Sequence, residues 1–129
     1  MEHDTLARAL SAMNHAEAKG KPELLIAPAS KVISAVLEIL KAEGYIHAFE
    51  VIDNKKGGQI KVLLAGKINK IGSIKPRYSI SKSGYETFEQ SYLPAKGFGR
   101  LIVSTSKGYM THENAKQKKL GGVLLAYVY

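Results

Sequence analysis

The chain contains 129 residues, 45% of them hydrophobic, and its 19 lysines and arginines against 11 acidic residues give a net charge of +8. This length suits one domain or two small lobes, and the apolar content allows a core to form without covalent cross-links. The sequence has no cysteine, which excludes disulfides and thiolate metal sites, and its four histidines show no metal-ligand spacing. No apolar run approaches the roughly 20 residues that cross a bilayer. We therefore expect a soluble intracellular protein with no cofactor and no membrane partner.

The positive charge is unevenly distributed along the chain. Residues 1–53 contain five basic and eight acidic side chains, a balance of −3, whereas residues 54–129 contain fourteen and three, a balance of +11. Eight of the ten Phe and Tyr residues also lie in the basic half. A basic, aromatic-rich segment is typical of a polyanion-binding face. A generally basic surface is the plainer alternative.

The first residues predict a helix followed by a strand. Asp4 is expected to cap the helix, whose apolar positions recur at helical spacing as far as Met13. Gly20 and Pro22 then end it, because neither residue continues a helix well. Residues 23–26 predict a short strand.

A second helix is predicted from Ser30, its N-cap, to Gly44, which suits the position just after a helix C-terminus. Residues 45–52 and 60–65 then predict a hairpin around the turn 53–58. This order of elements suits a three-stranded sheet covered by two helices.

The composition changes over residues 66–73, where glycine and lysine separate isolated isoleucines. We therefore expect two domains, an N-terminal α/β domain of residues 1–66 and a C-terminal RNA-binding domain of residues 67–129. The expected fold class is α+β with two small lobes. The first has the order helix, strand, helix and hairpin, and the second is mainly β with a short helix.

The second lobe predicts short elements. Thr111 is expected to cap a brief helix that runs to Lys119, after which Gly121-Gly122 supplies a turn. Residues 85–92 fit a strand or a helix equally well. Strands are predicted at residues 77–80, 100–104 and 123–129.

The segment Ser104-Thr105-Ser106-Lys107-Gly108 places three hydroxyls and a lysine in one turn, directly after an apolar strand. Such a turn suits a phosphate loop, a serine nucleophile or a plain hairpin. A nucleophile needs a base within reach, but the pattern G-x-S-x-G is missing, and we expect the nearby His112 to be an exposed first-turn residue. The phosphate-loop pattern G-x-x-x-x-G-K-[ST] is missing as well. Glu86 and Glu89 are expected to be solvated and to form no acid–base pair. Since none of these catalytic patterns is complete, we do not expect an enzyme.

The same segment suits RNA. The hydroxyls of Ser104, Thr105 and Ser106 can donate and accept hydrogen bonds at phosphates, base edges and ribose. Lys107 can neutralise a phosphate, Gly108 allows a close backbone approach, and Tyr109 can stack on an unpaired base. Each residue also has a structural interpretation, because Ser, Thr and Gly favour turns and Tyr109 can pack. Together, within a basic half, they favour RNA binding.

Several of these motifs, in the same order, resemble one known family. The segment from Ser104 through Met110-Thr111 and Ala115 to Gly121-Gly122 is similar to the C-terminal signature of the eighth protein of the small ribosomal subunit. Upstream, Asp4 to Leu6, Ser30-Lys31 and Glu43-Gly44-Tyr45-Ile46 resemble the family's first domain. Asn69-Lys70-Ile71-Gly72 with Pro76-Arg77-Tyr78 resembles its archaeal and eukaryotic branch. The resemblance covers essentially the whole chain.

The resemblance implies a two-domain ribosomal protein of the cytoplasm, monomeric when free, that binds the central domain of small-subunit ribosomal RNA and nucleates assembly beside other ribosomal proteins. It implies that Ser104 to Gly108 contact the RNA, while Gly121 and Gly122 shape the neighbouring turn. By chemistry alone, Asp4 is a helix cap, Asn14 a helix-end residue and Lys31 an exposed first-turn residue. The resemblance implies that these three, together with Thr5, are secondary RNA contacts. Val123 departs from the glutamate that many family members carry there. The alternative is a general RNA-binding or protein-interaction module outside the ribosome.

Overall fold

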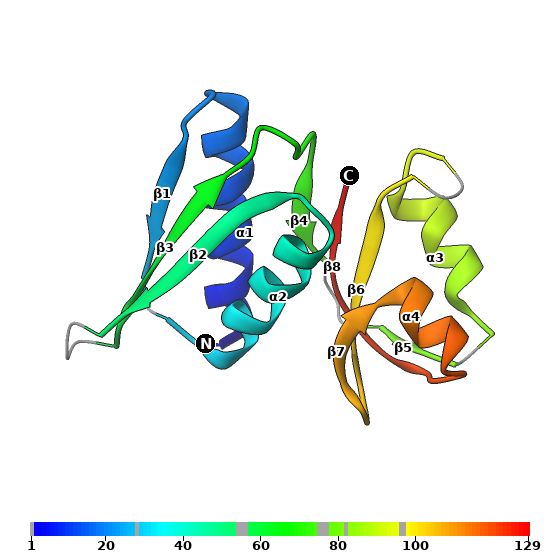
Figure 1. Ribbon diagram of the computed structural model, residues 1–129. Helices are drawn as coiled ribbons and strands as arrows, with labels where there is room; N and C mark the ends of the chain where they lie inside the picture. The colour runs from blue at the N-terminus through cyan, green and yellow to red at the C-terminus, as the bar shows by residue number, and fades with distance from the viewer. Residues whose placement is uncertain (1, 28, 54–56, 75–77, 82, 96–97) are drawn as a thin grey trace. The chain divides into compact units, whose positions relative to one another are not determined.

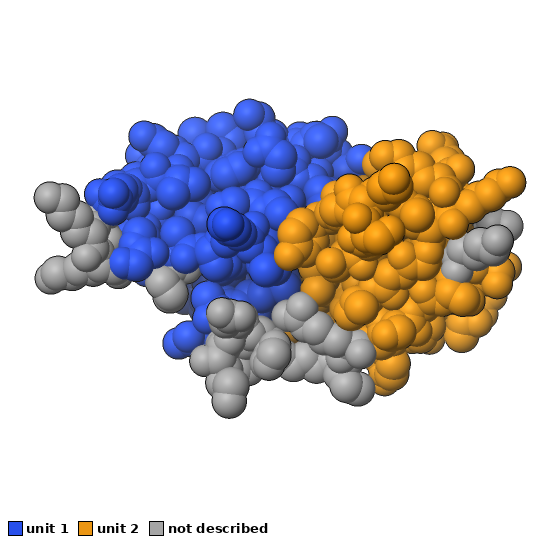
Figure 2. Space-filling view, turned by 90° about the horizontal axis from the view of Figure 1, so that it is seen from below, with its two compact units in different colours: residues 1–71 blue, residues 72–129 orange. Residues whose placement is uncertain are grey.

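The computed structural model describes residues 2–27, 29–53, 57–74, 78–81, 83–95 and 98–129. The chain forms two compact units, residues 1–71 and residues 72–129 (Figure 2). The division therefore follows Ile71, whereas the composition suggested a boundary after residue 66. Helices and antiparallel strand pairs occur in both units, which confirms the α+β fold class.

Unit 1 contains a three-stranded antiparallel sheet in the order β1-β3-β2. Helices α1 and α2 lie on the same side of this sheet (Figure 1). The predicted hairpin is confirmed, because β2 and β3 are paired, from Ile46 opposite Leu64 to Ile52 opposite Gln59. The predicted strand at residues 23–26 is β1. The elements are α1 (Glu2–Ala18), β1 (Glu23–Ile26), α2 (Lys31–Ala42), β2 (Ile46–Ile52) and β3 (Gln59–Leu64).

The core of unit 1 lies between the helices and the sheet. On β3 the buried residues alternate with more exposed ones, as a strand with one covered face requires. Helix α2 contributes one apolar stripe at helical spacing. The buried apolar residues of the helices include Leu6, Leu10, Met13, Ile33, Val36, Leu37 and Leu40, and those of the sheet include Ile26, Ile46, Ile60, Val62 and Leu64.

Both ends of α2 follow the sequence prediction. The Ser30 hydroxyl accepts a hydrogen bond from the Ile33 backbone N–H at 3.1 Å, as an N-cap does. Gly44 follows the C-cap residue Glu43 with a φ of +84°, and its N–H donates to the Lys41 carbonyl. A left-handed residue at this position suits glycine, because it lacks a Cβ.

Two expectations for α1 were wrong. The helix begins at Glu2, so Asp4 lies inside it and is not its cap. The helix also continues past Asn14 to Ala18, and the Asn14 side chain accepts a hydrogen bond from the Ile71 backbone N–H at 3.1 Å. Asn14 therefore anchors the end of unit 1 to α1, a role set by a residue distant in sequence.

Unit 2 is built on an antiparallel sheet in the order β4-β8-β6-β7, with β5 also paired to β8. The ambiguous segment 85–92 is helix α3, so the described part of this unit contains two helices where the sequence predicted one. Arg77, the expected start of a strand, lies outside the described residues. The elements are β4 (Ile71–Ser73), β5 (Ser79–Ile80), α3 (Tyr85–Tyr92), β6 (Arg100–Thr105), β7 (Gly108–Thr111), α4 (His112–Gln117) and β8 (Gly122–Val128).

The two ends of α4 had different outcomes. Thr111 caps the helix as predicted, since its hydroxyl accepts from the Asn114 N–H at 3.3 Å. The turn after the helix, however, lies at Lys118 and Lys119, and Gly122 already belongs to β8. Lys119 has a φ of +57°, a conformation that costs a non-glycine residue about 1–2 kcal/mol. The predicted Gly121-Gly122 turn was therefore misplaced.

Candidate nucleic-acid interface

The segment singled out in the sequence forms the tip of the β6–β7 hairpin. Thr105 pairs with Gly108 and Ser104 with Tyr109, so Ser106 and Lys107 form a two-residue turn between the strands. Ser104 and Thr105 are thus strand residues, not parts of a loop. Figure 1 shows this tip extending beyond the other strands of unit 2.

The Thr105 hydroxyl holds the turn closed. It donates to the Gly108 carbonyl at 2.8 Å and accepts from the Lys107 backbone N–H at 3.1 Å. These two bonds use the hydroxyl proton and one of its two acceptor positions. One acceptor position remains for a ligand, so Thr105 acts mainly by fixing its neighbours.

The neighbouring polar side chains have no such partners. Within the described part of the chain, the hydroxyls of Ser104 and Ser106 form no hydrogen bond, and the ammonium of Lys107 forms no ion pair. Ser106 and Lys107 are exposed, and Ser104 is half-buried. The hairpin therefore presents two hydroxyls and one cation that can bind a ligand without first breaking an internal contact.

Gly108 and Tyr109 complete the tip. Gly108 has a φ of +115°, and a Cβ placed there would have no heavy atom within 4 Å. Glycine is therefore required by the backbone conformation, and the space beside it is open. Tyr109 is 39% exposed, so part of this aromatic residue is accessible to a ligand.

Strand β8 fixes the position of Ser104 from the other side. A Cβ on Gly122 would lie 2.4 Å from the Ser104 carbonyl oxygen, so only glycine allows β8 to approach β6 this closely. Val123 pairs with Ser104 across the two strands. The residue that departs from the family pattern is therefore a direct neighbour of the hydroxyl turn, and no carboxylate stands beside Ser104 at this position.

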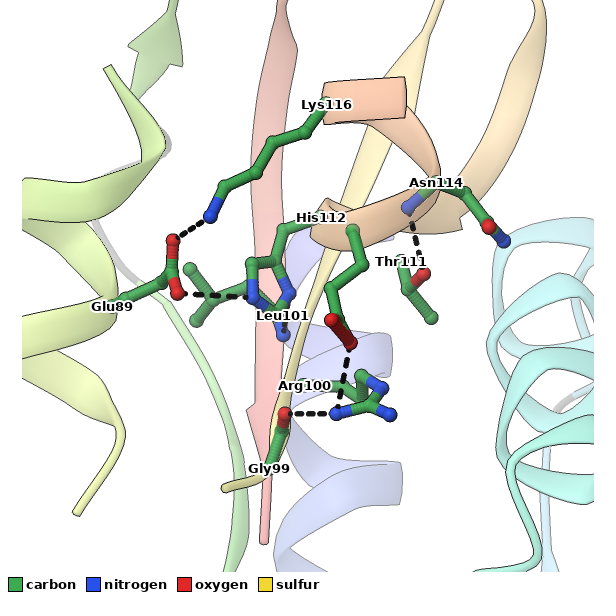
Figure 3. Close-up of polar contacts among 9 residues, drawn as sticks. Glu89, Gly99, Arg100, Leu101, Thr111, His112, Asn114 and Lys116 are labelled. Carbon is green, nitrogen blue, oxygen red and sulfur yellow. Dashed lines mark hydrogen bonds and ion pairs between the residues drawn. The ribbon is translucent and has the colours of Figure 1, made fainter. Parts of the chain in front are cut away.

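A buried polar network supports the base of the hairpin (Figure 3). The Leu101 N–H of β6 donates to Nδ1 of His112 at 3.0 Å, and Nε2 of His112 lies 3.4 Å from Oε1 of Glu89 on α3. The other carboxylate oxygen of Glu89 pairs with the Lys116 ammonium on α4. The network thus ties two helices to the strand that carries Ser104.

The network corrects two expectations. His112 is 3% exposed and is not an exposed first-turn residue, and the Glu89 side chain is only 12% exposed and is not solvated. Their burial depends on α3 packing beside α4, and no local sequence pattern reports that packing. His112 directly follows Gly108-Tyr109-Met110-Thr111, which is not a continuous apolar run, so the sequence carried no signal for its burial.

Burial lowers the pKa of His112, although the Glu89 carboxylate opposes this by favouring the cation. The burial effect dominates, so the imidazole is neutral at neutral pH. Nδ1 accepts from Leu101, so the ring proton is on Nε2 and is directed at Glu89. Both ring nitrogens are engaged in structural contacts, and His112 is not arranged as a base for Ser104 or Ser106.

The charge asymmetry is weaker when it is counted by structural unit. Residues 1–71 contain ten basic and eight acidic side chains, a balance of +2, and residues 72–129 contain nine and three, a balance of +6. The division at residue 53 assigned several lysines of unit 1 to the basic half. All eight aromatic residues of that half remain in unit 2.

The four N-terminal candidates do not form one cluster. Asp4 and Thr5 lie in the first turns of α1, and Lys31 is the exposed first residue of α2. Both helices begin at the same end of unit 1 (Figure 1). Asn14 is ten helical residues beyond Asp4, about 15 Å along the axis, and its side chain is engaged with Ile71.

Two kinds of feature are absent from the described residues. Among them, no group of three or more His, Asp or Glu side chains could hold a metal ion. None of the helices described has the length and apolar character needed to cross a membrane.

Comparison with known proteins gives a consistent result. The family model of ribosomal protein S8 matches residues 4–129. The chain is 50% identical over 129 residues to the small ribosomal subunit protein uS8 of Archaeoglobus fulgidus, and the match covers all of both chains. It is 48% identical over 126 residues to the protein of that name from Methanosphaerula palustris, covering 98% of this chain and 97% of the relative. This family consists of ribosomal structural proteins and not of enzymes, and the chain belongs to it.

Proposed function

We propose that this protein is a structural constituent of the small ribosomal subunit that binds the central domain of its ribosomal RNA directly and nucleates assembly. The observation that carries the proposal is the β6–β7 tip, where the side chains of Ser104, Ser106 and Lys107 have no partner among the described residues while the Thr105 hydroxyl holds the turn. Both archaeal relatives bear the name of a small-subunit protein, which supports the ribosomal setting. Free in solution, we expect a monomer with no membrane partner.

Affinity and selectivity have separate sources in this proposal. The lysines and arginines of unit 2, with a balance of +6, release counterions when they approach phosphates. The hydroxyls of Ser104 and Ser106 contact ribose and base edges, which Lys107 alone cannot distinguish. Because the major groove of A-form RNA is deep and narrow, the compact tip enters the wide minor groove or a distorted segment.

The surrounding residues assist this contact. Tyr109 stacks on an unpaired base, and the open space beside Gly108 admits the RNA backbone. Gly122 holds β8 against Ser104, and Gly121 connects that strand to the α4 region. These two glycines act by positioning the hydroxyl turn.

Unit 1 supplies secondary contacts. Lys31 lies at the positive end of the α2 dipole, and the helix has no acidic residue in its first turn. Both the dipole and the charge of Lys31 therefore attract a phosphate to this helix end. Asp4 and Thr5 begin α1 at the same end of the unit. Asn14 is the weakest of the four, because its side chain already binds Ile71.

A salt titration tests the proposal. Binding to a fragment of small-subunit ribosomal RNA from the central domain is measured by filter retention for the wild type, Lys107→Ala, Lys31→Ala and the control Lys41→Ala. Loss of one phosphate contact reduces the slope of log affinity against log salt by roughly 0.7–0.9. We expect this reduction for Lys107→Ala, a smaller one for Lys31→Ala and none for Lys41→Ala.

One kind of result would overturn this function, and another would change only which unit carries the main RNA contact. Binding that does not depend on salt, or cellular complexes that survive nuclease, would favour a protein-interaction module outside the ribosome. A larger loss from Lys31→Ala than from Lys107→Ala would mean that unit 1 carries the principal RNA contact.

A further inference from the structure

The face of the unit 1 sheet that points away from α1 and α2 carries exposed apolar side chains. Leu25 on β1 is 58% exposed, and Leu63 on β3 is 38% exposed. The register pairs Leu25 with Lys61 and Glu23 with Leu63, so both leucines share this face and lie diagonally across the two strands. Ile52 on β2 pairs with Gln59 on the same face, and a groove runs between Leu25, Ile52 and the stem of Lys61.

The charges on this face differ in sign from those of the protein as a whole. Lys61 pairs with Glu23 at 3.2 Å, and Glu50 lies opposite Lys61 in the sheet register. Glu50 forms no ion pair with any residue that the structure describes. The three charged side chains therefore leave one negative charge on an apolar surface of a protein whose net charge is +8.

This combination disfavours RNA as the occupant. Phosphates are repelled by Glu23 and Glu50, and the single cation between them is already paired. Single exposed leucines are common on protein surfaces, but two on adjacent strands of one open sheet face, beside a carboxylate that has no ion pair among the described residues, suit a protein partner. Charge complementarity then requires that the partner carry lysine or arginine beside its apolar contact residues.

We propose that this open sheet face, formed by Leu25, Leu63, Ile52 and Glu50, is the docking site for a second ribosomal protein that presents apolar side chains next to a lysine or arginine. The proposal rests on the ribosomal setting of the proposed function but not on the β6–β7 tip. The principal RNA contact then lies on unit 2, and the protein neighbour binds the bare face of the unit 1 sheet.

The absence of native cysteine allows a direct test. Leu25→Cys and, separately, Leu63→Cys are labelled with a photoactivated maleimide cross-linker and mixed with total protein extracted from small subunits of the same organism and freed of nucleic acid. Lys41→Cys, an exposed position on α2, is the matched control. We expect both face variants to form an adduct with one ribosomal protein through a segment that contains lysine or arginine. The control should form none, and adding Glu50→Lys should abolish the adduct.

Several outcomes would overturn the proposal: no adduct from either face variant, an adduct with a second copy of this chain, equal adducts from the control, or an adduct that survives Glu50→Lys. If the experiment is repeated in reconstituted subunits, an adduct that disappears on nuclease treatment would identify RNA as the occupant instead. Binding of the same variants to the ribosomal RNA fragment is measured in parallel and should be unchanged. Loss of RNA binding by the face variants would place RNA on this face and count against the proposal. Failure of the wild type itself to bind the fragment, with the adduct intact, would count against the proposed function and not against this face.

Discussion

The roles of Thr105 and Ser106 can be separated by experiment, because one hydroxyl is used within the hairpin and its neighbour is not. Thr105→Val keeps the shape of the side chain but removes the bonds to the Gly108 carbonyl and the Lys107 N–H. A hydrogen bond contributes about 0.5–1.5 kcal/mol, and these two are exposed to water, so the lower values apply. We expect unfolding to become easier by about 1 kcal/mol.

Ser106→Ala removes no internal contact, so its free energy of unfolding should stay within about 0.5 kcal/mol of the wild type. Its affinity for the ribosomal RNA fragment should nevertheless fall by about 0.5–1.5 kcal/mol, roughly two- to tenfold, because a direct contact is lost. Thr105→Val should also lose affinity, by about fivefold if RNA must restore the order that the turn has lost. Thr105→Ser, which keeps the hydroxyl, should resemble the wild type in both measurements.

The assays are urea denaturation and RNA binding at one fixed salt concentration. A Thr105→Val variant that binds RNA as tightly as the wild type would refute the role given to Thr105, and so would a Thr105→Ser variant as impaired as Thr105→Val. If Ser106→Ala lowered stability as much as Thr105→Val does, Ser106 would have an internal role and not a free hydroxyl.

Three further predictions concern the scaffold. Burial lowers the folded-state pKa of His112 below its unfolded value near 6.5, so stability is lost as pH falls through the folded pKa. The urea midpoints measured at pH 5 and at pH 7.5 should therefore differ more for the wild type than for His112→Asn. Equal differences in the two proteins would refute this. Lys119→Gly relieves about 1–2 kcal/mol of backbone strain, while the greater freedom of glycine in the unfolded chain costs about 0.5–1 kcal/mol. The free energy of unfolding should therefore rise by roughly 0.5–1 kcal/mol. A lower free energy of unfolding would argue against the left-handed conformation at Lys119. Gly122→Ala forces β8 away from Ser104, which should cost about 1–3 kcal/mol in stability and weaken RNA binding, whereas wild-type stability would contradict the close approach.

Predictions that depended on neighbours in sequence were generally confirmed. Ser30 and Thr111 cap helices because each hydroxyl reaches an N–H three residues later, a contact that needs no other part of the chain. Gly44 ends α2 for an equally local reason. The exception is the end of α4, where the local preference for glycine predicted a turn at Gly121-Gly122 and the left-handed position fell on Lys119 instead.

Predictions that depended on distant parts of the chain were less successful. The burial of His112 and Glu89 follows from the packing of α3 beside α4, and Asn14 is engaged by Ile71 near the other end of unit 1. The charge asymmetry was overstated because the division between units falls after Ile71. None of these contacts leaves a pattern in a short sequence window.

The sequence alone determined the α+β class, most of the secondary structure, the family and the hydroxyl turn, because helix caps, strand alternation and ordered motifs are written in neighbouring residues. Only the tertiary structure decided which hydroxyls of that turn are available. The strand pairing places Gly108 opposite Thr105, so the Thr105 hydroxyl is used within the hairpin, whereas the hydroxyls of Ser104 and Ser106 have no partner among the described residues. It also exposed Leu25 and Leu63 on one face of a sheet, since strand register, and not sequence spacing, sets which side chains share a surface.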